Sequence, residues 1–219
     1  MRGLVSVPLL AVIAYFRKSL FIRIDWRNWR VILVRAFAEL ASTMLFLTAL
    51  AHMPLANITA ILQSLPLTVT MFAAVFFGEA VGWRRWSAIL VGFIGVLIII
   101  RPGSDGFNEY AVLALVAVGF ITLRDAITRR LDRSVPSLFV AFVSAIPIFL
   151  FGGAMTVTTG WTPISWSMGM IVIVAAIAIT CGYSFAVMAM RNGDISFVAP
   201  FRYTGMIWAI LFGFLLFGN

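Results

Sequence analysis

The chain alternates long apolar runs with short polar stretches, and this pattern predicts a series of membrane-spanning helices. Most runs approach the roughly 20 apolar residues that a helix needs to cross the hydrocarbon core of a bilayer. Charged residues gather between the runs, where the chain would leave the bilayer. The pattern predicts eight helices, over residues 3–16, 31–50, 58–77, 83–100, 110–127, 137–155, 168–189 and 195–217.

The composition agrees with a membrane protein and argues against a soluble one. Hydrophobic residues make up 63% of the chain and charged residues 11%, and the mean hydropathy is +1.07. A water-soluble domain of this size could not bury so much apolar surface. We therefore predict an all-α fold, a polytopic membrane helical bundle, with membrane lipid as one partner.

The positive charges lie mainly on one side of the predicted bundle. A net charge of +8 invites a nucleic-acid partner, but nearly all basic residues lie in short loops between apolar runs. If the chain crosses the membrane eight times, one side carries Arg17, Lys18, Arg23, Arg27, Arg30, Arg84, Arg85, Arg124, Arg129, Arg130, Arg133 and Arg191. Basic loop residues mark the cytoplasmic side. We therefore expect no nucleic-acid partner and a location in the bacterial cytoplasmic (inner) membrane.

Residues 49–79 are similar to residues 189–219 when the frame is shifted by 140 positions. The matched pairs include Leu55 with Ile195, Ile58 with Val198, Gln63 with Tyr203, Ser64 with Thr204 and Phe72 with Phe212. Because the offset covers an odd number of helices, the two copies would be inverted relative to each other, as in many secondary transporters. We expect repeats over 1–104 and 105–219, each one helix short of a 5+5, ten-helix unit.

Four short motifs follow one another in the first half of the chain. They are Pro54-Leu55-Ala56, Gly78-Glu79, Trp83-Arg84-Arg85 and Arg101-Pro102-Gly103. Together with SFVAPFRYTGMIWAILFGFLLFG near the end, this ordered set resembles EamA-type transporters of the drug/metabolite transporter superfamily. The resemblance implies ten helices, a central cavity, and efflux or exchange of small polar or amphiphilic metabolites. The chain departs from the family pattern because the first and last helices are missing.

Arg35 and Glu39 are the first candidate site residues, because they lie one turn apart on one face of a predicted helix. Ionisable residues inside a membrane are costly and commonly functional. Glu39 would bind a cationic substrate or a coupling proton. In the alternative interpretation, Arg35 extends to the nearby membrane edge and Glu39 only neutralises it.

The other candidates come from the repeat and from aromatic residues. Arg202 and Tyr203 lie in the last predicted helix, and matching polar positions in the two repeats are expected of a midplane site. Pro66 and Pro200 remove backbone hydrogen bonds and are candidate hinges. Tyr183 and Trp208 could stack on a substrate, although packing between helices is the simpler role. The predicted substrate pathway comprises Arg35, Glu39, Gln63, Ser64, Tyr183, Arg202, Tyr203, Thr204 and Trp208.

Two alternatives to a gradient-driven transporter stay open. A membrane-embedded enzyme would need clustered catalytic side chains, whereas the chain has one histidine, His52, and scattered acids. With one cysteine, Cys181, in an apolar run, we expect no metal site and no cofactor. The second alternative is a truncated membrane fragment without transport activity. Beyond a small-molecule substrate, a homodimer is a further partner that the sequence leaves open.

Overall fold

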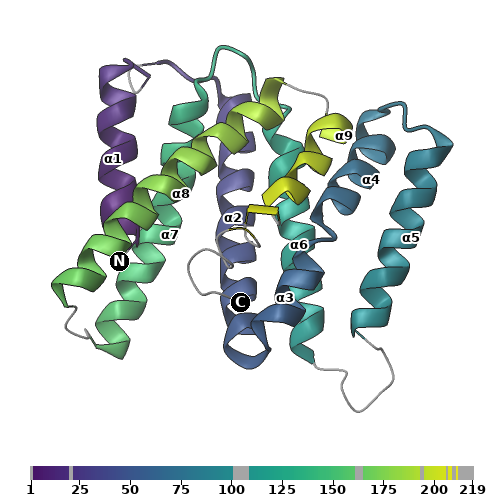
Figure 1. Cartoon of the computed structure of the whole chain (residues 1–219). Helices are drawn as coiled ribbons and strands as arrows, with labels where there is room; N and C mark the ends of the chain where they lie inside the picture. The colour runs from purple at the N-terminus through teal and green to yellow at the C-terminus, as the bar shows by residue number, and fades with distance from the viewer. Residues whose placement is uncertain are drawn as a thin grey trace. The chain divides into compact units, whose positions relative to one another are not determined.

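The computed structural model describes residues 2–19, 22–100, 109–160, 165–192, 195–205, 207, 208 and 211. Every regular element in these residues is helical, which confirms the predicted all-α class (Figure 1). The elements are α1 (Arg2–Phe16), α2 (Trp26–His52), α3 (Leu55–Leu62), α4 (Leu65–Phe77), α5 (Trp83–Ile100), α6 (Glu109–Thr128), α7 (Ser137–Thr159), α8 (Trp166–Asn192), α9 (Ile195–Val198) and the 3-10 helix η1 (Ala199–Tyr203).

The chain forms two compact units, each built from segments that are far apart in the sequence. Unit 1 comprises Met1–Ala41 and Ile127–Asn192, and unit 2 comprises Ser42–Ala126 and Gly193–Asn219. The long helices α2 and α6 each contribute residues to both units. The units therefore differ from the repeats expected over 1–104 and 105–219, which stay a prediction.

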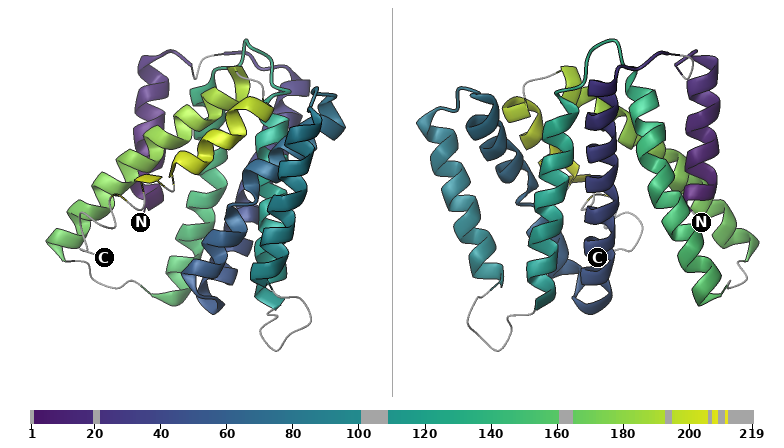
Figure 2. Two further views of the ribbon diagram at one scale, coloured as in Figure 1. Left: turned by 45° about the vertical axis from the view of Figure 1, so that its right-hand side comes forward. Right: turned by 180° about the vertical axis from the view of Figure 1, so that it is seen from behind.

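In unit 1, α1 packs against α7 and α8, and α7 packs against α8 (Figure 1, Figure 2). The buried residues of α8 are Ala176, Thr180, Val187 and Met190, and the half-buried Tyr183 lies between them. Because these residues recur every three or four positions, they lie on one face of the helix. Much of the remaining α8 surface is apolar and exposed, which suits a helix that contacts lipid tails.

Within unit 1, hydrogen bonds hold the loop between α6 and α7 in place. Asn28 of α2 and Asp132 form two hydrogen bonds, each 3.2 Å long, between the amide of one residue and an oxygen of the other. Arg191 of α8 donates to the carbonyl oxygens of Asp132 and Val135 and, at 2.9 Å, to Ser137 Oγ. One arginine thereby satisfies carbonyl groups that the turn leaves without helical partners.

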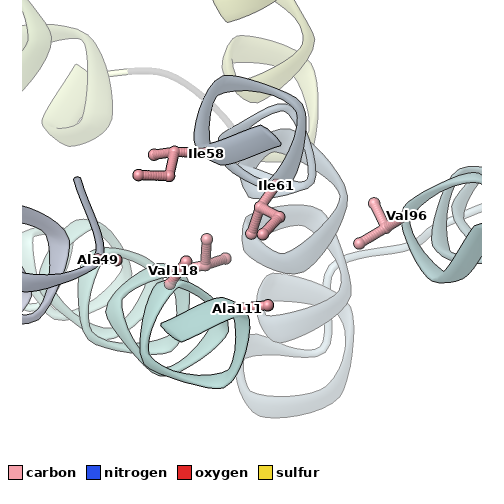
Figure 3. Close-up of a cluster of buried hydrophobic side chains, with 7 residues drawn as sticks. Ala49, Ile58, Ile61, Val96, Ala111 and Val118 are labelled. Carbon is pink, nitrogen blue, oxygen red and sulfur yellow. The ribbon is translucent and has the colours of Figure 1, made fainter. Parts of the chain in front are cut away.

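Unit 2 has its own apolar core, which Figure 3 shows. The core is formed by Ala49 of α2, Ile58 and Ile61 of α3, Val96 of α5, and Ala111, Ala114 and Val118 of α6. In this unit, α4 packs against α5, α9 and η1, and α3 packs against α5. Gly92 permits the α4–α5 approach, because a Cβ there would lie 2.2 Å from Leu67 Cδ1.

Two helical interruptions in unit 2 each have a proline in the turn that follows. The helix expected over 58–77 is divided into α3 and α4 at Gln63 and Ser64, and Pro66 lies in the first turn of α4. Because proline has no N–H, the Leu62 carbonyl loses its usual donor four residues ahead. Likewise, α9 gives way to η1, whose first turn contains Pro200. The hinge roles of both prolines stay predictions.

The predicted number of membrane spans is too high for the described residues. Five helices are long and apolar enough to cross a membrane: Trp26–His52, Asn57–Phe77, Glu109–Thr128, Ser137–Val157 and Met168–Arg191. The first expected span has only the short apolar helix Val5–Phe16, and α5 begins with a turn that contains Arg84 and Arg85. The eighth, over 195–217, begins with the four-residue α9 and the five-residue η1, and 212–217 lie outside the described residues. For the described residues, the prediction of eight spans is therefore corrected to five.

Candidate functional site

A buried arginine is the centre of a polar cluster in unit 1. We name this set of five residues, Arg35, Glu39, Thr128, Ser144 and Tyr183, the Arg35 cluster. Helix α2 supplies Arg35 and Glu39, while Thr128 ends α6, Ser144 lies on α7 and Tyr183 on α8. Only 2% of Arg35 is exposed, and Glu39, Thr128 and Ser144 are also buried. The cluster therefore joins four helices through side chains that are withdrawn from solvent.

The Arg35 guanidinium donates hydrogen bonds to three hydroxyl groups. Its Nε lies 2.8 Å from Thr128 Oγ1, and its Nη1 lies 2.5 Å from Ser144 Oγ and 2.9 Å from the Tyr183 hydroxyl. The guanidinium carbon also lies 5.5 Å from the centre of the Tyr183 ring, within the range of a cation–π interaction. A planar guanidinium with five N–H donors suits this arrangement, since it reaches several acceptors at once.

Tyr183 links the two charged groups of the cluster. Its hydroxyl accepts from Arg35 and donates to Glu39 Oε2 at 2.8 Å, whereas Arg35 Nη1 and Glu39 Oε2 are 3.9 Å apart. A hydroxyl has one proton, so the Tyr183 proton is committed to the carboxylate. The ion pair is therefore connected mainly through the tyrosine.

The structure brings together the predicted residues Arg35, Glu39 and Tyr183, all inside unit 1. The Arg35 side chain is buried and its donors engage other helices. Thr128 and Ser144 were not predicted. Hydroxyl residues are common in apolar helices, where they bond their own backbone, so no pattern in the sequence distinguishes these two.

A second polar cluster lies in unit 2 and comprises Gln63, Arg124, Asp125, Arg202 and Tyr203. We name it the Arg202 cluster. It joins the interruption between α3 and α4 to α6 and η1. The Tyr203 hydroxyl donates to the backbone carbonyl oxygen of Gln63 at 2.9 Å. These two residues are one of the pairs that the sequence matches at an offset of 140 positions.

Asp125 is the buried acid of the Arg202 cluster, and only 4% of it is exposed. Arg124 Nε lies 2.9 Å from its Oδ1, and Arg202 Nη2 donates to its Oδ2. Asp125 was not a predicted site residue, and its neighbour Arg124 was assigned to a cytoplasmic edge. An acid inside the helix expected over 110–127 was the signal that could have found it.

The remaining predicted residues of unit 2 have local or exposed positions. Ser64 Oγ donates to the Ile61 carbonyl at 2.7 Å, and Thr204 Oγ1 donates to the Phe201 carbonyl at 2.7 Å. Trp208 is 57% exposed. Thr68 of α4 and Thr122 of α6, which were not predicted, share a 2.7 Å hydroxyl contact. The pathway roles of Ser64, Thr204 and Trp208 stay predictions.

The described residues give no sign of a metal centre. Among them, no group of three or more histidine, cysteine, aspartate or glutamate residues is placed to hold a metal ion. Both clusters are instead built from arginine, one acid and hydroxyl groups. Such groups can bind charged and polar parts of a small molecule through hydrogen bonds.

Comparison with known proteins points to one family. The model of the EamA-like transporter family matches residues 1–101. A riboflavin transporter of Vibrio cholerae is 29% identical over 215 residues, which are 95% of this chain and 71% of that protein. An S-adenosylmethionine uptake transporter of Rickettsia conorii is 25% identical over 167 residues, 76% of this chain and 56% of that protein. No solved structure matches the chain significantly.

A third relative, a pseudopaline exporter of Pseudomonas aeruginosa, is 25% identical over 195 residues, or 86% of this chain and 67% of that protein. The chain thus spans between 56% and 71% of the length of these three bacterial relatives. All three are transporters, which excludes the membrane-embedded enzyme considered from the sequence. The family match and the five apolar helices lead to one conclusion. The chain is a multi-pass membrane protein whose residues 1–101 match the EamA-like transporter family.

Proposed function

We propose that this chain is a gradient-driven secondary transporter of small polar or amphiphilic metabolites in the bacterial cytoplasmic membrane, acting by alternating access. The Arg35 cluster carries this proposal. Its charged pair lies on α2, and Tyr183 lies on α8, and both helices are long and apolar enough to cross a membrane. Ionisable side chains at such positions are costly, and they typically belong to substrate or ion pathways.

The Arg35 cluster is suited to respond to a proton or a cationic substrate at Glu39. With Glu39 ionised, the Tyr183 hydroxyl donates to the carboxylate and accepts from Arg35. A proton on Glu39 removes the charge that offsets Arg35 and turns the carboxyl group into a donor. If the proton is on Oε2, the Tyr183 hydroxyl must reorient to accept from it. A bound cation would have a similar effect, because it would compete with Arg35 for the carboxylate.

The Arg202 cluster is proposed to take part in substrate recognition, together with Ser64, Thr204 and Trp208. Three relatives are named for riboflavin, S-adenosylmethionine and pseudopaline. Riboflavin and S-adenosylmethionine are therefore the first substrates to test. We propose export or exchange as the direction, and the relatives include both an uptake transporter and an exporter.

Transport by Glu39→Gln tests this proposal. The purified chain is reconstituted into proteoliposomes, and counterflow of labelled riboflavin and S-adenosylmethionine is measured. The substitution keeps the size of the side chain but removes the charge that Tyr183 and Arg35 contact. A charged hydrogen bond is worth about 1.5–3 kcal/mol, so we expect transport to fall at least about tenfold. Glu109→Gln, at an exposed acid in the first turn of α6, is the matched control.

Membrane insertion and yield should be unchanged in both variants. A normal transport rate in Glu39→Gln would remove Glu39 from the mechanism. If the unaltered chain moves neither compound under any imposed ion gradient, the alternative of a membrane fragment without transport activity is favoured instead.

A further inference from the structure

We infer that the Arg202 cluster recognises an acidic group, a carboxylate or a phosphate, on the transported metabolite. This inference rests on the proposed transport function and names the substrate class that unit 2 selects. Arg202 also contacts Asp125, and the two roles use different donors of the guanidinium.

Two guanidinium groups share the Asp125 carboxylate. Arg124 Nε contacts Oδ1 at 2.9 Å, and Arg202 Nη2 contacts Oδ2. Arg124 alone supplies one positive charge against the one negative charge of Asp125. Arg202 therefore brings a second positive charge to a carboxylate that already has a cationic partner. These three side chains together carry one net positive charge, and a net positive charge favours a nearby anion.

Among the residues that the structure describes, no partner engages most donors of Arg202. Within the part of the chain that the structure describes, its polar contacts go to Asp125 alone and use Nη2. Nε and Nη1 together carry three further N–H donors. Because the donors of a guanidinium lie on separate edges of a plane, an arginine that is paired with one carboxylate can bind a second oxyanion. The side chain is 27% exposed, so a ligand can reach it.

The backbone around Arg202 provides a second observation. Arg202 lies in the 3-10 segment η1, which follows the four-residue α9 and contains Pro200. The adjacent Tyr203 connects η1 to the interruption between α3 and α4 through the Gln63 carbonyl. In membrane proteins, interrupted helices are tolerated where the backbone is buried in protein or lines a cavity, and transporters use such places to bind substrates. Arg202 is therefore placed where a substrate group would be expected.

Matched pairs of probes distinguish recognition of an acid from a purely structural role. Riboflavin 5′-phosphate is compared with riboflavin, and S-adenosylmethionine is compared with its methyl ester, which lacks the carboxylate. Dissociation constants are measured with the purified full chain in detergent, from the ligand-dependent rise in unfolding temperature. We expect the acidic member of at least one pair to bind about 10- to 100-fold more tightly, which is typical of one charged hydrogen-bonded contact.

Three variants test whether Arg202 causes the preference for the acidic probe. Arg202→Gln should reduce the affinity for the acid to that of its neutral partner and leave the neutral partner unaffected. Arg202→Lys keeps the charge next to Asp125 but loses donors, so it should fold normally and retain only part of the preference. Arg85→Gln removes the same charge from an exposed residue of α5 and should change neither affinity.

The inference is overturned if no acid binds more tightly than its neutral partner, including the case in which none of the four probes binds. It is also overturned if Arg202→Gln weakens both members of a pair equally, since that result indicates a structural role. Transport of riboflavin without a preference for acids would overturn this inference and keep the proposed function. Acid-selective binding without any transport would support this inference and overturn the proposed function.

Discussion

The Arg35 cluster and the Arg202 cluster use similar groups, an arginine, an acid and a tyrosine, but they differ in how fully those groups are engaged. Arg35 is 2% exposed and donates to three hydroxyls. Arg202 is 27% exposed, and among the described residues it contacts only Asp125. Tyr183 connects two charged side chains, whereas Tyr203 donates to one backbone carbonyl.

The difference follows the helices that carry each cluster. The Arg35 cluster lies on helices without a break at its residues, so each side chain is held by regular backbone and by neighbours in unit 1. The Arg202 cluster lies where helices are interrupted, at Gln63 and in η1. Local opening requires less free energy where fewer buried contacts are lost. We therefore expect the Arg35 cluster to be held more rigidly than the Arg202 cluster.

The largest expected difference is in stability after loss of each arginine. Arg35→Met leaves Glu39 buried without its cationic partner, which typically costs about 3–5 kcal/mol. Arg202→Met leaves Arg124 beside Asp125, so we expect the free energy of unfolding to fall by only about 1 kcal/mol. Unfolding of the purified chain in detergent measures both values. Arg35→Met combined with Glu39→Leu should recover much of the loss, because neither buried charge then remains. Equal losses for the two arginines would contradict the comparison.

The two tyrosines test the same comparison, with a smaller expected change in stability. Tyr183→Phe removes a buried hydroxyl that bonds two charged groups, and we expect it to lower the free energy of unfolding by about 2–3 kcal/mol. Tyr203→Phe removes one bond at a half-exposed position, for which about 1 kcal/mol is expected. The same unfolding measurement applies, and the phenyl ring preserves packing in both variants. A larger loss for Tyr203→Phe would show that unit 2 depends more on its polar contacts than unit 1.

Arg191→Gln tests whether polar contacts fix unit 1 beyond the Arg35 cluster. The substitution removes the donors to Asp132, Val135 and Ser137. We expect the free energy of unfolding to fall by about 1–2 kcal/mol. Amide hydrogen exchange over residues 129–136, measured by mass spectrometry, should become faster. Arg85→Gln should have no effect on either quantity. Unchanged exchange in Arg191→Gln would mean that the Asn28–Asp132 contact fixes the loop alone.

The smallest effect is expected from Pro66→Ala in unit 2. Alanine restores an N–H that can donate to the Leu62 carbonyl, while it also loosens the unfolded chain, so stability should change by less than about 1 kcal/mol. Hydrogen exchange over residues 62–68 should slow if α3 and α4 become one continuous helix. A slower transport rate in the same variant would support the hinge prediction. Faster exchange would show that Pro66 holds this interruption in place.

The sequence predicted Arg35, Glu39 and Tyr183 of the Arg35 cluster and missed Thr128 and Ser144 for a physical reason. Arg35 and Glu39 were found because charges in an apolar run are rare and their spacing places them on one face. Thr128 and Ser144 hold the same guanidinium from positions 93 and 109 residues away. Such contacts depend on how helices pack, and a single hydroxyl in an apolar helix has the same local pattern whether or not it meets a charge.

The helix count was predicted less well than the helical class. Apolar runs identify helices, since any segment in a bilayer must satisfy its own backbone. Whether a run forms one full span depends on breaks that composition does not reveal, such as the change from α9 to η1. The break at Gln63, by contrast, leaves Asn57–Phe77 long enough to span. Asp125 was missed because its neighbour Arg124 fitted a loop charge, although Asp125 itself is buried.

The bond between Tyr203 and Gln63 affects how mutation can act on the two halves of the sequence. The acceptor is a backbone carbonyl, which every residue provides, so substitution at position 63 preserves the acceptor. The donor is a phenol, and among the common side chains only tyrosine combines its reach with a hydroxyl proton. If both positions descend from one ancestral residue, a single copy now carries the chemical requirement. This bond therefore constrains the side chain of only that copy.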